Sequence, residues 1–180
     1  AGVTDIGVLL TGGIVVSDRL RIGGISMDAA IQAHARDVRG LVLGQRSAEK
    51  VKIELGARGW TGQEASAVVH GRNLADGLPR AETLSAREVS SALECPVNQI
   101  IESARCVFGC TPPELAADIA AGGIVLTGGG SRLVGLSGFM SERIGVTFRV
   151  ALDPETCVVR GIGQLLQGMD PRVTCAWKGA

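Results

Sequence analysis

The chain has 180 residues, of which 46% are hydrophobic and 20% are charged, as in an ordinary globular domain. Its 18 basic residues balance its 18 acidic ones and only 3% of residues are aromatic, which argues against a nucleic-acid-binding protein. There is no signal peptide and no apolar run of membrane-spanning length.

The N-terminal part of the sequence predicts a β-hairpin followed by a helix. Strands are expected at 5–10 and 14–16, joined around Thr11-Gly12-Gly13. Ser26 is the expected N-cap of a helix that ends at Gly40. Its apolar face is expected to contain Met27, Ala30, Ile31, His34, Ala35 and Val38.

The middle of the sequence predicts a second helix and two strands. The helix is expected over 47–55 and a loop over 56–66. Strands are expected at 67–72 and 78–84. Pro79 places the second of these strands at a sheet edge, because proline cannot donate a ladder hydrogen bond.

Two capping boxes punctuate the next, helical part of the chain. The first, at 85–88, opens a helix that we expect to end near Leu93, and Pro96 is expected to start the following helix. The second box, at 111–114, opens a short helix to Ala120. The helix after Pro96 has a core stripe of Val97, Ile100, Ile101, Ala104 and Phe108.

A β-branched run at 123–127 leads into Gly128-Gly129-Gly130 and then into a helix expected at 132–143. This unit often receives phosphate or nucleotide, because glycine lets the backbone approach a ligand and a helix N-terminus offers unpaired N–H groups. The segment lacks the last glycine of GxGxxG and the Lys-Ser/Thr of a P-loop, so a structural tight turn is an equal alternative. The closing elements are a strand at 146–150 and a helix at 155–167 that Asp153-Pro154 caps.

The cysteines and histidines predict no metal site. The five cysteines form no CxxC pair, and only His34 and His70 could join them. We expect His34 in the core, and Cys106 and Cys110, on one helix face, as two small buried hydrophobic residues. Reduced thiols indicate a cytosolic protein.

Strands alternate with helices, which predicts an α/β or α+β class with mixed strand pairing. The stretch 25–84 separates two sheet-like parts and is therefore expected to form an inserted lobe. The chain contains no fixed-period repeat and no low-complexity segment.

Seven segments, in order and with similar spacing, resemble the MreB/Mbl rod shape-determining family of bacterial actin homologues. They cover nearly all of residues 1–167, and GRNLADGLPR and TPPELAADI are specific to this family. The segments are TDIGVL (4–9), RIGG (21–24) with DAAI (28–31), GQRSAEKVK (44–52), GRNLADGLPR (71–80), TPPELAADI (111–119), LTGGG (126–130) and DPETCV (153–158).

The resemblance implies an α/β fold of the actin-like ATPase (ribonuclease H-like) type, with ATP in a cleft between two similar domains. The chain resembles the second of these, domain II, with 1–24 and 90–150 as its core lobe and 25–89 as a smaller inserted lobe. Residues 151–168 resemble a helix that packs on the first domain, and 169–180 form a tail. The chain begins within an expected strand, which indicates a truncated or processed start.

Members of the family clasp the β- and γ-phosphates between two glycine-rich hairpins, one from each domain. The start of this chain resembles the tail of the second hairpin: Gly2 matches a phosphate-loop glycine, Val3 replaces a threonine and Thr4 follows. The first hairpin, its Mg²⁺-linked aspartate and the water-orienting residue have no counterpart here. We therefore assign no catalytic residue and no metal ligand, and expect negligible ATP hydrolysis by this chain alone.

The purine side of the family's site is better represented. Glu49 and Lys52, three apart on one helix face, resemble residues that reach the ribose hydroxyls and the adenine edge, with Lys50 and Val51 between them. On spacing alone, a solvated ion pair between the two is favoured. Asp5 is either a second-layer phosphate group or, equally, a helix-capping or turn residue. The loop that passes beneath the adenine and the α-phosphate resembles Gly128, Gly129, Gly130, Ser131 and Arg132.

The resemblance implies a subunit or fragment of an ATP-dependent filament that organises cell-wall synthesis and rod shape. The implied cofactor is ATP or ADP, Mg²⁺-dependent in the family and bound weakly or not at all by this chain. The implied partners are further copies of the chain, in filaments or dimers, and cell-wall synthesis and morphogenesis proteins. The location is cytoplasmic, at the inner face of the membrane, with membrane contact only through partners.

Two alternatives to the filament subunit stay open. One is an interaction module of the same descent that no longer needs nucleotide, and the weaker one is a phosphotransferase of the sugar-kinase and chaperone superfamily. Whichever holds, an apolar face on the last helix is expected to favour association. That face is formed by Val158, Ile162, Leu165 and Leu166.

Overall fold

A computed structural model describes residues 2–10, 13–56 and 58–167. Its strands are β1 (Thr4–Leu10), β2 (Gly13–Leu20), β3 (Leu41–Val42), β4 (Ser66–Asn73), β5 (Pro79–Ser85), β6 (Ile124–Leu126) and β7 (Phe148–Val150). Its helices are α1 (Gly24–Arg39), α2 (Gln45–Leu55), α3 (Ala86–Gly109), α4 (Pro113–Gly122), α5 (Leu136–Ile144) and α6 (Cys157–Leu166), with 3-10 turns η1 (Arg58–Thr61) and η2 (Gly129–Arg132). Part of the hairpin turn expected at 11–13 and the tail at 169–180 lie outside the described residues.

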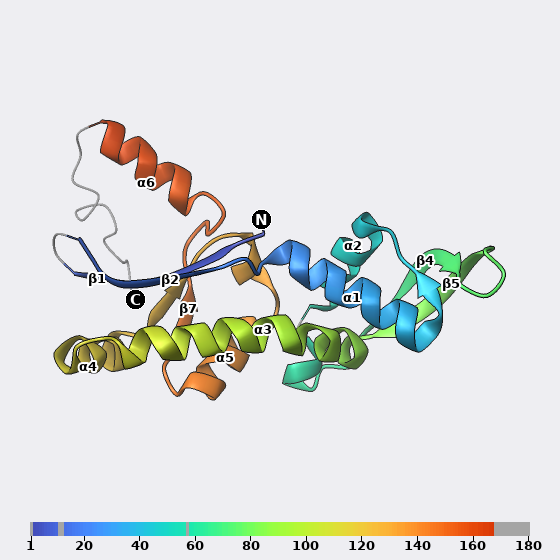
Figure 1. Ribbon diagram of the computed structural model, residues 1–180, viewed down its shortest axis with the longest axis horizontal. Helices are drawn as coiled ribbons and strands as arrows, with labels where there is room; N and C mark the ends of the chain where they lie inside the picture. Colours follow the sequence, from blue (N-terminus) through green and yellow to red (C-terminus); the bar gives the residue numbers. More distant parts are fainter. Residues whose placement is uncertain (1, 11–12, 57, 168–180) are drawn as a thin grey trace.

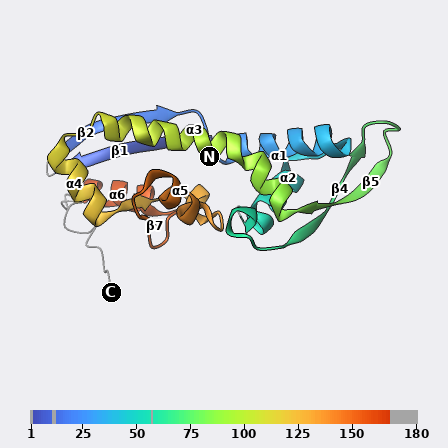
Figure 2. The same cartoon turned by 90° about the horizontal axis from the view of Figure 1, so that it is seen from below.

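The strands form three small sheets with mixed pairing. β1 and β2 are antiparallel, β3-β4-β5 form an antiparallel sheet with β5 at its edge, and β6 and β7 are parallel. Figure 1 shows α3 running along the molecule, with α1, α2, β4 and β5 at one end and β1, β2, β7, α4 and α5 at the other; Figure 2 shows the same division from below. The α/β class and the edge position of 78–84 are confirmed.

One hydrophobic core links the two ends of the molecule. In α1 and α2 the buried apolar residues recur at helical spacing, which is why these segments form amphipathic helices. Burying one such Leu, Ile or Val side chain contributes about 1.5–3 kcal/mol. The buried residues of these two helices and of the start of α3 include Met27, Ile31, Ala35, Ala48, Val51, Leu55, Val89 and Leu93.

Helix α3 is continuous, so the break expected between Leu93 and Pro96 is wrong. Pro96 lies inside the helix and is itself buried. A proline in a helix interior removes one backbone hydrogen bond and costs about 3 kcal/mol. The buried stripe runs without interruption from Leu93 through Val97 to Ile101, and packing of this stripe outweighs that cost.

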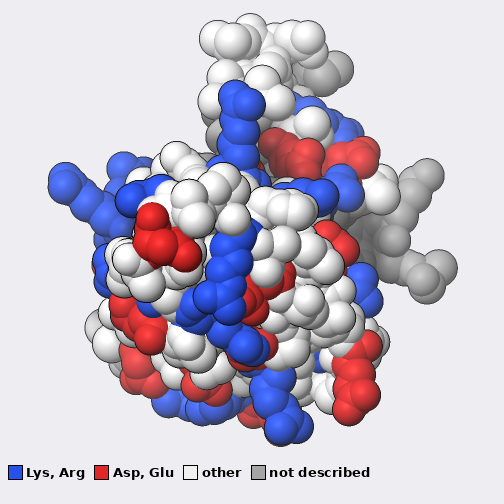
Figure 3. All heavy atoms as spheres, turned by 90° about the vertical axis from the view of Figure 1, so that its right-hand side faces the viewer, with Lys and Arg blue, Asp and Glu red and all other residues white. Residues whose placement is uncertain are grey.

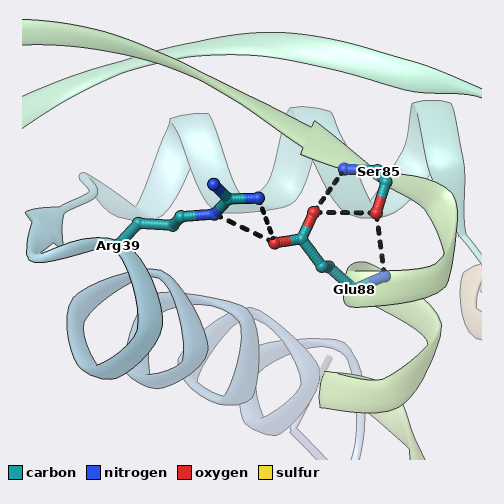
Figure 4. Close-up of polar contacts among 3 residues, drawn as sticks. All are labelled: Arg39, Ser85 and Glu88. Carbon is teal, nitrogen blue, oxygen red and sulfur yellow. Dashed lines mark hydrogen bonds and ion pairs between the residues drawn. The ribbon is translucent and has the colours of Figure 1, made fainter.

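The capping box predicted at the N-terminus of α3 is confirmed, and its Glu88 also contacts a neighbouring helix. The Ser85 hydroxyl accepts a hydrogen bond from Glu88 N–H (3.3 Å), while Glu88 Oε2 accepts from Ser85 N–H (2.9 Å) and from its hydroxyl (2.7 Å). The other carboxylate oxygen of Glu88 pairs with Arg39 of α1 (Figure 4). A local cap therefore also fixes α1 against α3.

The expected starts of α1 and α4 are wrong. The extended backbone of Gly23 makes it the N-cap of α1, so Ser26 lies within the first turn. At α4, the Thr111 hydroxyl donates instead to the carbonyl of Val107 (2.7 Å), which leaves the expected second capping box unformed. A hydroxyl that has satisfied a preceding carbonyl does not cap the helix that follows.

Two further helix starts also differ from expectation. The 3-10 turn η2 begins within the glycines, at Gly129, and α5 begins only at Leu136, rather than at 132. Helix α6 begins at Cys157 without a side-chain cap, and Asp153 instead adopts a left-handed conformation with φ of 48°. Both helices are preceded by tight turns, and the spacing of apolar residues does not specify the geometry of such turns.

Three side chains were expected on the wrong side of a helix. Cys106 and Cys110 are exposed, because Ala104 and Val107 supply the buried face of that part of α3. Val38 is likewise exposed. His34 is half-buried, and its Nε2 is buried without a hydrogen-bond partner among the described residues.

The surface carries charges of both signs. Figure 3 looks onto the right-hand end of Figure 1, where Lys and Arg side chains lie among acidic and uncharged residues. This agrees with the balanced composition. Within the described residues, none of the helices has the length and apolarity needed to cross a bilayer.

Candidate nucleotide-binding half-site

Lys52 is held at the start of α1 and not by Glu49. Its Nζ lies 2.7 Å from Asp28 Oδ1 and donates a hydrogen bond to the Gly24 carbonyl (3.1 Å). The side chains of Lys52 and Asp28 are only 12% and 5% exposed. The solvated pair with Glu49, one of the two sequence interpretations, is therefore replaced by a buried link between α2 and α1.

The other residues of this stretch divide between surface and core. Glu49 and Lys50 are exposed, so both side chains can reach a ligand. Val51 is buried in the hydrophobic core and could meet a ligand only through its backbone. Helix α2 thus presents a carboxylate to solvent on one side while anchoring itself to the core on the other.

The glycine-rich loop at 128–132 is tied to the segment that leads into α6. Gly128 has φ of 81°, and its N–H donates to the Pro154 carbonyl (2.7 Å). Buried Ser131 donates from its hydroxyl to the Gly128 carbonyl (2.7 Å), and Arg132 Nε lies 3.1 Å from Glu155 Oε1. These contacts hold the loop in one conformation.

This loop fits a bound ligand in one respect and departs from the sequence prediction in another. A Cβ added at Gly128 or Gly130 would meet nothing within 4 Å, so the space beside the backbone is open. The helix dipole expected directly after the glycines is displaced, because α5 begins only at Leu136. Close backbone approach, and not a helix N-terminus, is what the loop offers.

The start of the chain lies against α1. The Thr4 hydroxyl donates to the Ile22 carbonyl (2.8 Å), and the Cβ position of Gly2 is 3.6 Å from Ile25 Cδ1. Val3 is exposed. Asp5 faces Arg19 across the hairpin and forms an exposed ion pair with it.

A chain of contacts connects the three predicted segments. Gly2 approaches the first turn of α1, the first turn of α1 holds Lys52, and α2 ends at Gly56. The Cβ position of Gly56 is 3.4 Å from Leu133 Cδ1, directly after the glycine loop. Figure 1 shows the described start of the N-terminal strand close to the start of α1. The predicted residues therefore border the junction between the two ends of the molecule.

Sequence reasoning missed two features of this junction. The first is Asp28, which the sequence analysis named only as part of a motif. Asp28 lies beside Met27 and one turn before Ile31, on the buried face of α1. A carboxylate on a buried face needs a partner, and this was the signal in the sequence. Trp60 stacks on Phe139 with ring centroids 4.0 Å apart, and the Arg143 guanidinium lies 4.9 Å from the Phe139 centroid. This stack joins η1 to α5.

The described residues contain no group of three or more His, Cys, Asp or Glu side chains that could hold a metal ion. The junction offers the ammonium groups of Lys50 and Lys52, the exposed carboxylate of Glu49 and glycine backbone. Such groups suit the hydroxyls and ring edge of a nucleoside.

Comparison with known proteins relates most of the chain to one family. A family model described as MreB/Mbl protein matches residues 1–173. The chain is 41% identical over 170 residues to cell shape-determining protein MreB of Escherichia coli K12, which covers 94% of this chain and 49% of that protein. It therefore spans about half the length of the curated relatives it matches.

Solved structures agree with the sequence matches. MreB5 of Spiroplasma citri bound to ADP superimposes with a TM-score of 0.89 at 27% identity, over 97% of this chain and 53% of that one. A double helical filament of MamK gives 0.75 at 25% identity, over 94% and 53%. The resemblance drawn from sequence and the actin-like fold are both confirmed.

Proposed function

The chain belongs to the MreB/Mbl family, and we propose that it is the domain II part of an actin-like, adenine-nucleotide-linked filament subunit that acts in cell shape and cell-wall organisation. The E. coli relative is named a cell shape-determining protein. Since this chain spans about half of that relative, the activity of a complete subunit is part of the proposal.

The proposed division of the chain follows its packing. Residues 1–24 and 90–150 form the core lobe, 25–89 the inserted lobe, and 151–168 a helix that joins another domain. Helix α3 supports this division, because it packs on α1 and η1 and also on β1 and β2. Its length makes it the shared spine of both lobes.

The observation that carries the nucleotide proposal is a chain of contacts. Gly2 lies against the first turn of α1, Lys52 is bonded to that turn, and the end of α2 lies against Leu133, beside the glycine loop. There Glu49 can accept hydrogen bonds from ribose hydroxyls, and Lys52 can donate to a polar ring edge. The open backbone at Gly128 and Gly130 lets a ligand lie close to the chain. ATP or ADP is the proposed ligand, and MreB5 of Spiroplasma citri was solved with ADP.

These residues bind and orient, and they do not by themselves complete an ATPase. Phosphoryl transfer depends on positioning of the nucleophile and on neutralising spread phosphate charge, with Mg²⁺ supplying much of that charge. Among the basic groups of the proposed site, Lys52 is already paired with Asp28, and Arg132 is paired with Glu155. We therefore propose Mg²⁺-dependent turnover only for a complete two-domain site.

Calorimetric titration with Mg-ADP tests the half-site. Saturable binding by the 180-residue chain that is lost in Glu49→Ala supports it. Glu54→Ala is the matched control, because Glu54 is also exposed on α2 but lies about 140° further round the helix. No binding at millimolar nucleotide, or equal loss in both variants, contradicts the proposal.

Self-association and location form the second part of the proposal. MamK, a structural relative, was solved as a double helical filament, which supports assembly of this chain with further copies. We place the assembly in the cytoplasm at the inner face of the membrane, held there through cell-wall synthesis and morphogenesis proteins. Cell fractionation with crosslinking to such proteins tests this placement.

One observation favours a second candidate function, an interaction module that no longer needs nucleotide. Lys52 already has two partners inside the protein, Asp28 and Gly24. If these are its only partners in solution, the glycines at 128–130 act only as a turn. The titration with Mg-ADP separates the two candidates.

A further inference from the structure

The buried pair of Asp28 and Lys52 is the strongest polar link at the junction. Asp28 lies near the N-terminal end of α1 and is 4% exposed, where an unpaired carboxylate would be costly. Its Oδ1 is buried and accepts no hydrogen bond of regular geometry, so its contact with Lys52 Nζ at 2.7 Å is an ion pair. The ammonium directs its aligned hydrogen bond to the Gly24 carbonyl (3.1 Å).

We propose that Asp28 is a positioning residue that fixes the direction of Lys52 and cancels its charge, so that this half-site selects the nucleoside and not the number of phosphates. The inference rests on the proposed nucleotide function. It adds to that function a residue outside the predicted site and a rule for ligand choice.

The direction of Lys52 follows from its donors. An ammonium has three N–H donors. One is directed to the Gly24 carbonyl and a second faces Asp28, which leaves one donor for a ligand. A flexible lysine side chain loses conformational entropy when it binds a ligand. Because the two internal partners already order Lys52 in the free protein, less entropy is lost on binding.

The choice of ligand follows from charge. A lone ammonium attracts every phosphate group within several ångströms, and the attraction grows with phosphate charge. With Asp28 at 2.7 Å, Lys52 is half of a neutral pair, whose field falls off faster with distance. Its remaining donor then favours a neutral acceptor, such as a ribose hydroxyl or a purine nitrogen.

The same pair also braces α2 against α1, so loss of stability alone cannot identify the positioning role. Calorimetric titration of the 180-residue chain with adenosine and with ADP can identify this role. The ratio of the two affinities does not depend on how stable the protein is. Asp28→Asn keeps the shape of the side chain and removes its charge. We expect it to raise the preference for ADP over adenosine by about three- to tenfold.

A second variant guards against misfolding of the first. Asp28→Leu combined with Lys52→Met removes both charges, and buried ion pairs often tolerate such apolar replacement. This folded double variant should lose most adenosine affinity if Lys52 contacts the nucleoside. Glu88→Gln is the matched control: it breaks an ion pair to the other end of α1, about 16 Å from Asp28, and should leave both affinities unchanged.

The possible outcomes distinguish failure of the positioning role of Asp28 from failure of the proposed nucleotide binding. If the unmodified chain binds adenosine and ADP but Asp28→Asn leaves their ratio unchanged, the positioning role is wrong and the half-site stands. Unchanged adenosine affinity in the double variant has the same meaning. If the unmodified chain binds neither ligand, the half-site fails and this inference fails with it.

Discussion

Arg39, in the last turn of α1, donates to Glu88 Oε1 from both Nε (3.0 Å) and Nη2 (2.6 Å), and so ties that helix to the capping box of α3. The two residues are 49 apart in sequence. An N-cap that stabilises α3 locally thereby also fixes the packing of α1 against α3 (Figure 4).

The Arg39–Glu88 contact predicts acid sensitivity. Burial raises the pKa of Glu88, but hydrogen bonds from the Ser85 N–H and hydroxyl and the pairing with Arg39 outweigh it, so its pKa lies below the usual 4.5. A carboxyl whose pKa is lower in the folded than in the unfolded state stabilises the fold above its unfolded pKa. That stabilisation is lost as pH falls through the folded value.

We therefore expect Glu88→Gln to lower the free energy of unfolding by about 1–2 kcal/mol at pH 7, from the lost cap and a partly screened ion pair. The difference from the unmodified chain should shrink as pH falls below about 4.5. Urea unfolding of both proteins at several pH values measures it. A difference that stays constant down to pH 3 contradicts this account.

Gly59 is predicted to be irreplaceable by alanine. A Cβ at this position would lie 2.6 Å from Ser90 Oγ, 2.7 Å from the Ala86 carbonyl and 2.8 Å from Arg87 Cα. Two of these are backbone atoms of α3 and cannot rotate away. Forced overpacking of this kind costs about 1–3 kcal/mol.

Thermal unfolding of Gly59→Ala measures this cost, with Gly109→Ala as control. A Cβ at Gly109, the last residue of α3, would meet nothing within 4 Å. The control should be neutral or stabilising by up to about 1 kcal/mol, because alanine favours the helix. Equal melting temperatures for the two variants would show that η1 and α3 can separate at little cost.

The parts of the fold that sequence predicted are those that local pattern determines. Apolar spacing found α1, α2 and the stripe of α3, because burial imposes the same periodicity on sequence and structure. Pro96 was misleading because a local rule competes with the packing of a long helix, and packing prevailed. Ser26 and Thr111 were misleading for a similar reason, since each is a cap residue by type whose backbone or hydroxyl is used otherwise.

The candidate site was accessible from sequence only through resemblance. Spacing alone favoured a surface pair of Glu49 and Lys52, and nothing local indicates that Lys52 reaches Asp28, 24 positions earlier on another helix. The Trp60–Phe139 stack is likewise a contact between distant segments. Such pairings depend on how helices pack, which periodicity does not specify.

ATP turnover provides a third prediction. The 180-residue chain should release phosphate from Mg-ATP at a rate indistinguishable from its Lys52→Met variant. The part of the chain that the structure describes contains no cluster of three or more His, Cys, Asp or Glu side chains that could hold Mg²⁺, and phosphoryl transfer depends on such charge neutralisation. Continuous phosphate detection measures this, with an established ATPase at the same concentration as positive control. A rate comparable with that control would show that these residues complete an active site.

Helix α6 gives the last prediction, self-association of the chain. Within the described residues no side chain of α6 is buried, and the helix stands apart from the others (Figure 1). Val158, Ile162 and Leu165 are 67%, 52% and 62% exposed. Apolar surface on one helix face associates when it meets a second such face, because burial removes it from water.

We therefore expect dimers or larger species at high concentration in sedimentation velocity. Ile162→Glu with Leu165→Glu should shift the chain to monomer, since each charge would have to be buried at the contact. Arg160→Glu, an exposed change on the same helix outside the apolar face, is the control and should leave association in place. A monomeric unmodified chain at high concentration would mean that α6 is covered by its own chain in solution, and that assembly depends on other surfaces.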